Sequence, residues 1–213
     1  KAQLDLNAVN MEVKEKFKSD PFKGAEELKT RRQEILDGYG EQISPFFKKA
    51  WQENARELGT KEDIQIQTWA YTQSRKNTVT SINNSIKNNM SQASQDGMLY
   101  GQSETTELSS LLNFGLSKKK LASFGDAHIG GEETTALLEG YDDNYLKSFI
   151  SGVSEANPLK ALRLMDDKGV QASFKDQKQF LKMKDAVENR ALQINKINAE
   201  NQVLTTLKDE NNV

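Results

Sequence analysis

The sequence predicts an all-α fold, an elongated helical bundle with two long helices and coiled-coil-like packing. Three observations lead to this prediction. Residues 174–210 contain neither Pro nor Gly and carry apolar residues at heptad spacing, the pattern of a long helix that packs against a partner. Residues 61–96 form a second long stretch with helical apolar spacing. Each of the three Pro follows directly on a residue that can cap a helix, so the prolines mark helix starts rather than breaks.

The closing helix, over residues 174–210, is predicted to carry an interface. Its apolar residues recur in steps of three and four and occupy two seam positions. One position is held by Phe180, Val187 and Ile194, and the other by Met183, Ile197 and Leu204. Asn201 falls on the same seam, where a polar residue sets the register of a coiled coil. We expect this seam to join copies of the chain; the alternative is that it is buried within one chain.

Three helices are expected before residue 60. The first covers residues 4–18, and the second starts at Pro21 and ends near residues 38–40, so that the two form a helical hairpin. The third covers residues 45–58 and is expected to end at Gly59, with Thr60 capping the helix that follows. One side of this third helix is expected to be buried through Phe46, Phe47, Ala50, Trp51 and Leu58.

The second long helix, over residues 61–96, changes in composition along its length. Its second half is rich in Asn and Ser, which are mediocre helix formers, so this part depends on packing rather than on intrinsic propensity. Its apolar residues are a candidate interface, formed by Val79, Ile82, Ile86 and Met90. The alternatives are an ordinary core helix and a short strand over residues 78–82.

Glycines divide the chain between residues 97 and 169 into shorter elements. Helices are expected over residues 104–113, 117–123, 132–139, 142–155 and 158–165. The changes in composition define three regions: residues 1–97 ending in a long helix, residues 98–173 with short helices, and residues 174–213 with the closing helix. We expect these regions to form one structural unit. Because the chain starts at Lys1 rather than Met, we expect it to be a fragment of a longer protein.

Composition excludes several classes of function. The chain has 213 residues, 36% hydrophobic and 28% charged, which suits elongated helices with a large surface. It contains no Cys, so disulfides and thiolate chemistry are absent. The net charge of −2 provides no large field for nucleic acid, and contact with nucleic acid is expected only locally, at Lys118, Lys119 and Lys120. No apolar run is long enough to predict a transmembrane segment.

The sequence contains no catalytic or cofactor motif, so we predict that the protein is not an enzyme and needs no cofactor. Phosphate-binding loop patterns and the nucleophile-elbow pattern are missing. His128 is the only histidine, and with Asp126 and Glu132 or Glu133 it offers a candidate metal site. We favour a surface loop there, with acidic residues at a helix start. No small-molecule substrate and no metal is therefore predicted.

One segment resembles a known protein family. Residues 157–169 read Asn-Pro-Leu-Lys-Ala-Leu-Arg-Leu-Met-Asp-Asp-Lys-Gly and are followed by a polar link, Phe174 and a long charged helix. This arrangement is similar to a module of phage and prophage virion proteins. Residues 20–97, from Asp20-Pro21-Phe22 through Trp51 and Trp69, likewise resemble the helical parts of internal virion or DNA-ejection proteins of short-tailed phages.

The resemblance implies a structural component of a phage virion, internal or related to ejection. Such a protein assembles in the cytoplasm of a bacterial host through contacts between helices, with itself or with other helical virion proteins as partners. The alternative is a bacterial helical adaptor or secreted effector, located in the bacterial cytoplasm or secreted, that binds a protein partner.

Overall fold

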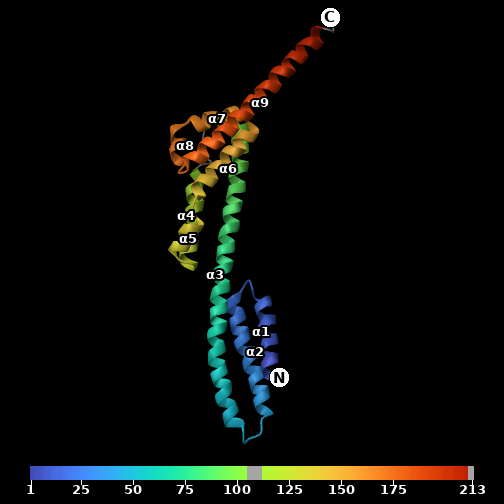
Figure 1. Cartoon of the computed structure of the whole chain (residues 1–213), viewed down its shortest axis with the longest axis vertical. Coiled ribbons are helices and arrows are strands. Elements are labelled where there is room, and N and C mark those ends of the chain that lie inside the picture. The colour runs from blue at the N-terminus through green and yellow to red at the C-terminus, as the bar shows by residue number, and fades with distance from the viewer. Residues whose placement is uncertain (105–111, 211–213) are drawn as a thin grey trace. The chain divides into compact units, whose positions relative to one another are not determined.

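The protein is all-α, as the sequence predicts (Figure 1). The structure is a computed structural model that describes residues 1–104 and 112–210, and within these ranges it contains helices and no strand. The chain divides into two compact units, residues 1–81 and 82–213. These units differ from the three regions predicted from composition, because their boundary falls inside one continuous helix rather than at a change in composition.

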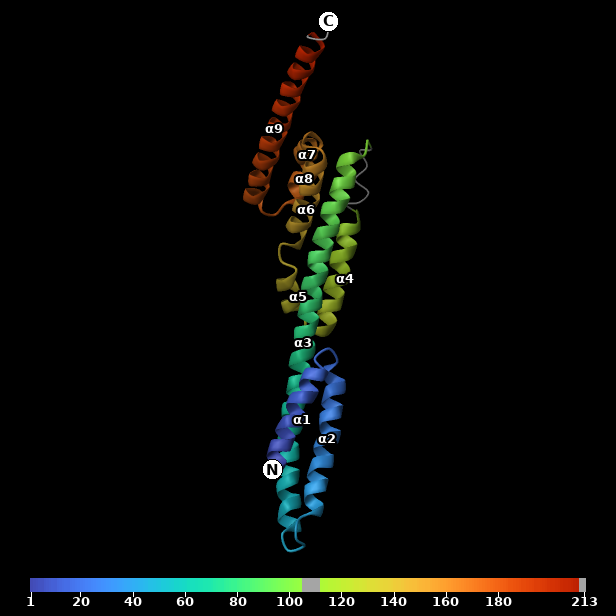
Figure 2. The ribbon, with the colours of Figure 1, turned by 90° about the vertical axis from the view of Figure 1, so that its right-hand side faces the viewer.

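Unit 1 packs three helical segments side by side: α1 (Ala2–Lys16), α2 (Pro21–Glu41) and the first part of α3 (Lys48–Gln102) (Figures 1 and 2). The predicted hairpin of the first two helices is present. The carboxylate of Asp20 accepts the Lys23 N–H at 3.4 Å and caps the start of α2, directly before Pro21. The small core of unit 1 is formed by Val13, Ala25, Leu28, Ile66 and Ala70.

The helix α3 is longer than predicted. The sequence predicts a break at Gly59, a new start at Thr60 and an end at residue 96, and all three are wrong, as is the alternative strand over residues 78–82. A Gly inside a helix costs only about 1 kcal/mol. At Gly59 the carbonyl accepts a hydrogen bond from Arg32 Nη1 at 3.3 Å, and further along the helix Gly97 and Gly101 lie against the backbone of α6.

Three predicted core residues, Phe46, Phe47 and Ala50, are exposed. Phe46 and Phe47 lie in the turn before α3 and are 87% and 61% exposed, so the prediction that they are buried on a helix face is wrong. The error follows from the predicted helix start. α3 begins at Lys48 rather than at Pro45, so the two rings belong to the loop and not to the helix face that meets α2.

The described residues of unit 2 form the second part of α3 and six further helices. They are α4 (Leu112–His128), α5 (Gly131–Leu137), α6 (Tyr141–Ala156), α7 (Pro158–Asp166), α8 (Lys168–Ser173) and α9 (Gln177–Glu210). Four of the five helices predicted between residues 97 and 169 are found, although α4 is longer than predicted because Gly115 and Gly125 lie inside it. Most of the predicted helix over residues 104–113 lies outside the described residues.

The helices α3 and α6 approach one another until their backbones are in contact. A Cβ atom on Gly97 would lie 2.0 Å from the carbonyl oxygen of Phe149, and one on Gly152 would lie 1.9 Å from that of Ser94. Only glycine allows two backbones so close together. Around this crossing lies the largest apolar core of the described residues, with Ala93, Phe149, Ile150 and Val153 at 0–1% exposure.

Two polar contacts fix the helices that follow. Lys160 on α7 donates hydrogen bonds from Nζ to the carbonyl oxygens of Tyr100, at 2.6 Å, and Ser103, at 2.9 Å. A cation at the last carbonyls of α3 also stabilises its helix dipole. The buried carboxylate of Asp143 on α6 accepts the N–H groups of Lys175 and Asp176 at 2.9 and 2.8 Å, immediately before α9.

The glycine contact leads to a stability prediction. Gly152→Ala places a methyl group where the Ser94 carbonyl stands, so α3 and α6 must separate, and we expect a loss of about 3 kcal/mol or more in the free energy of unfolding. Urea denaturation followed by circular dichroism measures this loss.

The control for this variant is Gly38→Ala. Gly38 is also helical, but nothing lies within 4 Å of an added Cβ, so this change is expected to stabilise the protein by about 0.5–1 kcal/mol. Equal stability of the Gly152→Ala variant and the native chain would contradict the close approach of the two helices.

Candidate functional site

The residues of the predicted interface on α3 are largely covered by the chain itself. Ile82 is fully buried, and Val79 is partly buried. Ile86 and Met90 are partly buried and pack against the apolar core of unit 2. This stripe therefore serves mainly to hold the chain together.

The first half of the α9 seam is also buried within the chain. Phe180 and Val187 are each 4% exposed, and Met183 packs against the same core. The Phe180 ring lies 5.1 Å from the Phe174 ring. Asp176 caps the helix by accepting the Gln179 N–H at 2.9 Å.

An ion pair also joins this half of α9 to α7. Lys184 Nζ donates to Asp166 Oδ1 at 2.8 Å, and this hydrogen bond raises the pKa of Lys184. The start of α9 is thus held by a capping carboxylate, by the Asp143 carboxylate on α6, by apolar packing and by this ion pair.

The second half of α9 is uncovered. Every residue from 192 to 205 is exposed, and this part of the helix extends away from α6, α7 and α8 in both views (Figures 1 and 2). The remaining residues of the predicted seam, Ile194, Ile197 and Leu204, are 37%, 54% and 55% exposed. An isolated helix of this length is only marginally stable in water, because most helical stability in proteins comes from packing of an apolar face.

The exposed seam continues the buried one. At 100° per residue, Ile194 and Asn201 fall on the side of α9 that also carries Val187 and Met183, and Ile197 and Leu204 lie beside them. The flanking positions are nearly uncharged, with Gln193, Asn198, Glu200 and Thr205. Glu200 has a cationic neighbour on the same helix, Lys196, at 4.0 Å. A second helix can therefore approach this seam without meeting strong charge repulsion.

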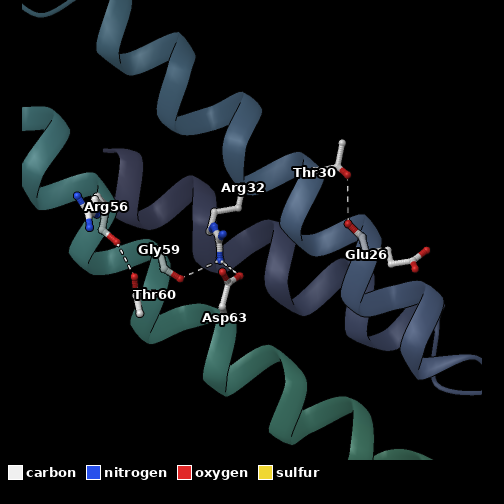
Figure 3. Close-up of polar contacts among 7 residues, drawn as sticks. All are labelled: Glu26, Thr30, Arg32, Arg56, Gly59, Thr60 and Asp63. Atoms are coloured by element: carbon white, nitrogen blue, oxygen red, sulfur yellow. Dashed lines mark hydrogen bonds and ion pairs between the residues drawn. The ribbon is translucent and has the colours of Figure 1, made fainter.

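A polar groove of about 650 Å³ lies between α2 and α3 in unit 1. Arg32, whose side chain is 11% exposed, donates from Nη1 to Asp63 Oδ1 at 2.8 Å and to the Gly59 carbonyl, so it joins the two helices (Figure 3). The groove lining carries charges of both signs: Arg32, Lys48 and Arg56 against Asp37, Glu41 and Asp63. Because the positive and negative charges of the lining are equal in number, the groove favours neither an anionic nor a cationic ligand.

The candidate metal ligands do not come together. Asp126 and Glu132 line a hollow in unit 2, but His128 is not among its lining residues. The His128 ring is exposed, with Nδ1 2.8 Å from the Phe124 carbonyl oxygen. Within residues 1–104 and 112–210, no three His, Cys, Asp or Glu side chains form a group that could hold a metal ion.

The basic run on α4 is partly engaged within the chain. Lys118 donates to Asp142 Oδ2 at 2.5 Å, while Lys119 and Lys120 are exposed. Of the three lysines predicted to contact nucleic acid locally, two are therefore exposed and one is paired with Asp142. None of the described helices combines the length and apolar composition needed to cross a membrane.

Comparison with protein-family models, with curated proteins and with solved structures finds no match to this chain. The assignment of a function therefore rests on the geometry of the chain and on the resemblance described above.

Sequence reasoning overlooked two features. Asp143 accepts a hydrogen bond from the Lys175 N–H just before α9, and the two residues are 32 positions apart. No local sequence pattern predicts a contact over this separation. The exposed pair Phe46 and Phe47 did leave a signal, because Ser44-Pro45 before the pair is a typical turn sequence.

The Arg32 contact predicts a difference between two neighbouring arginines. Arg32→Ala removes a partly buried ion pair and a hydrogen bond to the backbone of α3, and we expect a loss of about 2 kcal/mol in the free energy of unfolding. Chemical denaturation measures it.

Arg31→Ala is the matched control. Arg31 pairs with Glu12 at 2.9 Å on the surface, where solvent screens the interaction, so its loss is expected to be clearly smaller. Equal losses for the two variants would show that the Arg32 contact contributes no more than a surface ion pair.

Proposed function

We propose that this chain is a non-enzymatic assembly component that pairs with a second copy of itself through the C-terminal half of α9. The observation that carries the proposal is the seam of α9, whose apolar residues are buried within the chain up to Val187 and exposed from Ile194 onward, with the exposed Arg190 between these two parts. Burial of an Ile or Leu side chain contributes about 1.5–3 kcal/mol, so covering Ile194, Ile197 and Leu204 on two copies supports a stable pair.

A second copy of the same helix suits this seam better than an unrelated surface. In a parallel, in-register coiled coil, Ile194 faces Ile194 of the other copy and Asn201 faces Asn201. Paired Asn side chains at one seam position hydrogen-bond to each other and fix both register and the number of strands. In this proposal, the coiled-coil packing expected from the sequence forms between two copies of this exposed half of the helix.

The setting that we propose for this assembly is a phage virion, in an internal or ejection-related position. This part of the proposal is supported by the resemblance of residues 157–174 and 20–97 to helical virion proteins. The chain is all-α, and the seam on the second half of its last helix is exposed. Both features are consistent with a component that acts through contacts between helices.

Light scattering coupled to size-exclusion chromatography tests the pairing. The native chain is expected to elute as a dimer at all but the lowest concentrations. The double variant Ile194→Asp, Ile197→Asp places two charges per chain in the seam and is expected to weaken dimerisation at least about a hundredfold, giving a folded monomer. Both residues are exposed, so the fold of the monomer is expected to be retained.

The matched control is Leu192→Asp, Val203→Asp. These residues are 66% and 59% exposed on the same helix, but they lie on the opposite side from Ile194 and Asn201. The control is expected to remain a dimer. A native chain that stays monomeric, or a control that dissociates as readily as the seam variant, would overturn self-pairing.

A further inference from the structure

The turn between α2 and α3 presents an apolar tip at one end of unit 1 (Figures 1 and 2). All residues from 44 to 50 are exposed. The rings of Phe46 and Phe47 stand edge to face, with centroids 5.0 Å apart and planes at 88°. Two adjacent phenylalanines at such exposure leave unfavourable apolar surface in water, about 1.5–3 kcal/mol for each ring.

The backbone of this tip is ordered by its own hydrogen bonds. The Ser44 hydroxyl accepts the Phe46 N–H at 3.3 Å, and the Ser44 carbonyl accepts the Phe47 N–H at 2.9 Å. Pro45 restricts the backbone between them. The two rings are therefore held outward by a defined turn, which lowers the entropic cost of binding through them.

The charges at the tip are all of one sign. The exposed run from 44 to 50 contains Lys48 and Lys49 and no acidic residue. The acidic residues closest in sequence, Glu41 and Glu53, fall outside it, although Glu41 and Lys48 both line the polar groove between α2 and α3. Each lysine close to an anionic membrane surface contributes about 1 kcal/mol of attraction. Aromatic rings next to lysines at a protrusion suit the boundary between headgroups and acyl chains.

The size of the tip argues against a protein partner. A stable protein–protein interface covers about 800 Å² on each side. Two phenylalanine side chains present about 300–500 Å² in total. A lipid surface needs no such area, because it deforms around a protruding group.

We propose that the tip of the α2–α3 hairpin, residues 44–50, binds a lipid surface with anionic headgroups. The Phe46 and Phe47 rings enter the boundary below the headgroups, and Lys48 and Lys49 contact the headgroups. The tip lies in unit 1 and the proposed pairing seam lies on α9, so the two proposals rest on different residues and fail independently.

Vesicle flotation with the full chain tests this proposal. Vesicles of phosphatidylcholine and phosphatidylserine in a three-to-one ratio are compared with vesicles of phosphatidylcholine alone. The native chain is expected to float with the mixed vesicles. Phe46→Ser, Phe47→Ser is expected to bind them at least about a hundredfold more weakly, and Lys48→Gln, Lys49→Gln about thirtyfold more weakly.

The matched control is Phe22→Ser, Tyr71→Ser. These rings form the other exposed edge-to-face pair of unit 1, with centroids 5.2 Å apart, but they lie along the helices rather than at the tip. Their loss is expected to leave flotation unchanged, and thermal unfolding followed by circular dichroism verifies the fold of each variant. A native chain that stays unbound, a tip variant that floats like the native chain, or a control that weakens as much as the tip variant would overturn the proposal.

Discussion

Gly97 and Gly152 stand where α3 and α6 touch backbone to backbone, with less than 2.1 Å between an added Cβ and the opposite carbonyl oxygen. Much of unit 2 depends on this contact. It places Asp143, at the start of α6, where its carboxylate accepts the N–H groups of Lys175 and Asp176 and so directs the start of α9. α7 begins directly after α6 and sends Lys160 back to the last carbonyls of α3.

The same arrangement determines which part of α9 is buried within the chain and which part is exposed. The core that surrounds α6 covers Phe180 and Val187 but ends before Ile194. The seam of α9 is thereby divided into a part that is buried within the chain and a part that is exposed. This division underlies the proposed pairing, because the seam is exposed only on the part of α9 that lies beyond the core of unit 2.

Two of the exposed apolar surfaces differ in kind. The α9 seam is a long, nearly uncharged stripe, which suits another helix of equal pattern. The tip at Phe46 and Phe47 is a small protrusion followed by two lysines, which suits a soft, anionic surface. The two proposals therefore assign self-pairing to the α9 seam and lipid contact to the tip at Phe46 and Phe47.

The sequence by itself determined the helical class, most helix starts and the α9 stripe, because capping residues before Pro21 and Pro158 and a heptad pattern act within a few residues of the chain. The sequence-based prediction was wrong to place helix ends at Gly59 and Gly97. A glycine that ends a helix and a glycine that lets two helices come into contact cannot be distinguished from the sequence alone. Whether Val187 or Ile194 is buried was decided only by the tertiary structure. Burial depends on which distant residues arrive at each point of the helix, and no local pattern of α9 encodes where the core of unit 2 ends.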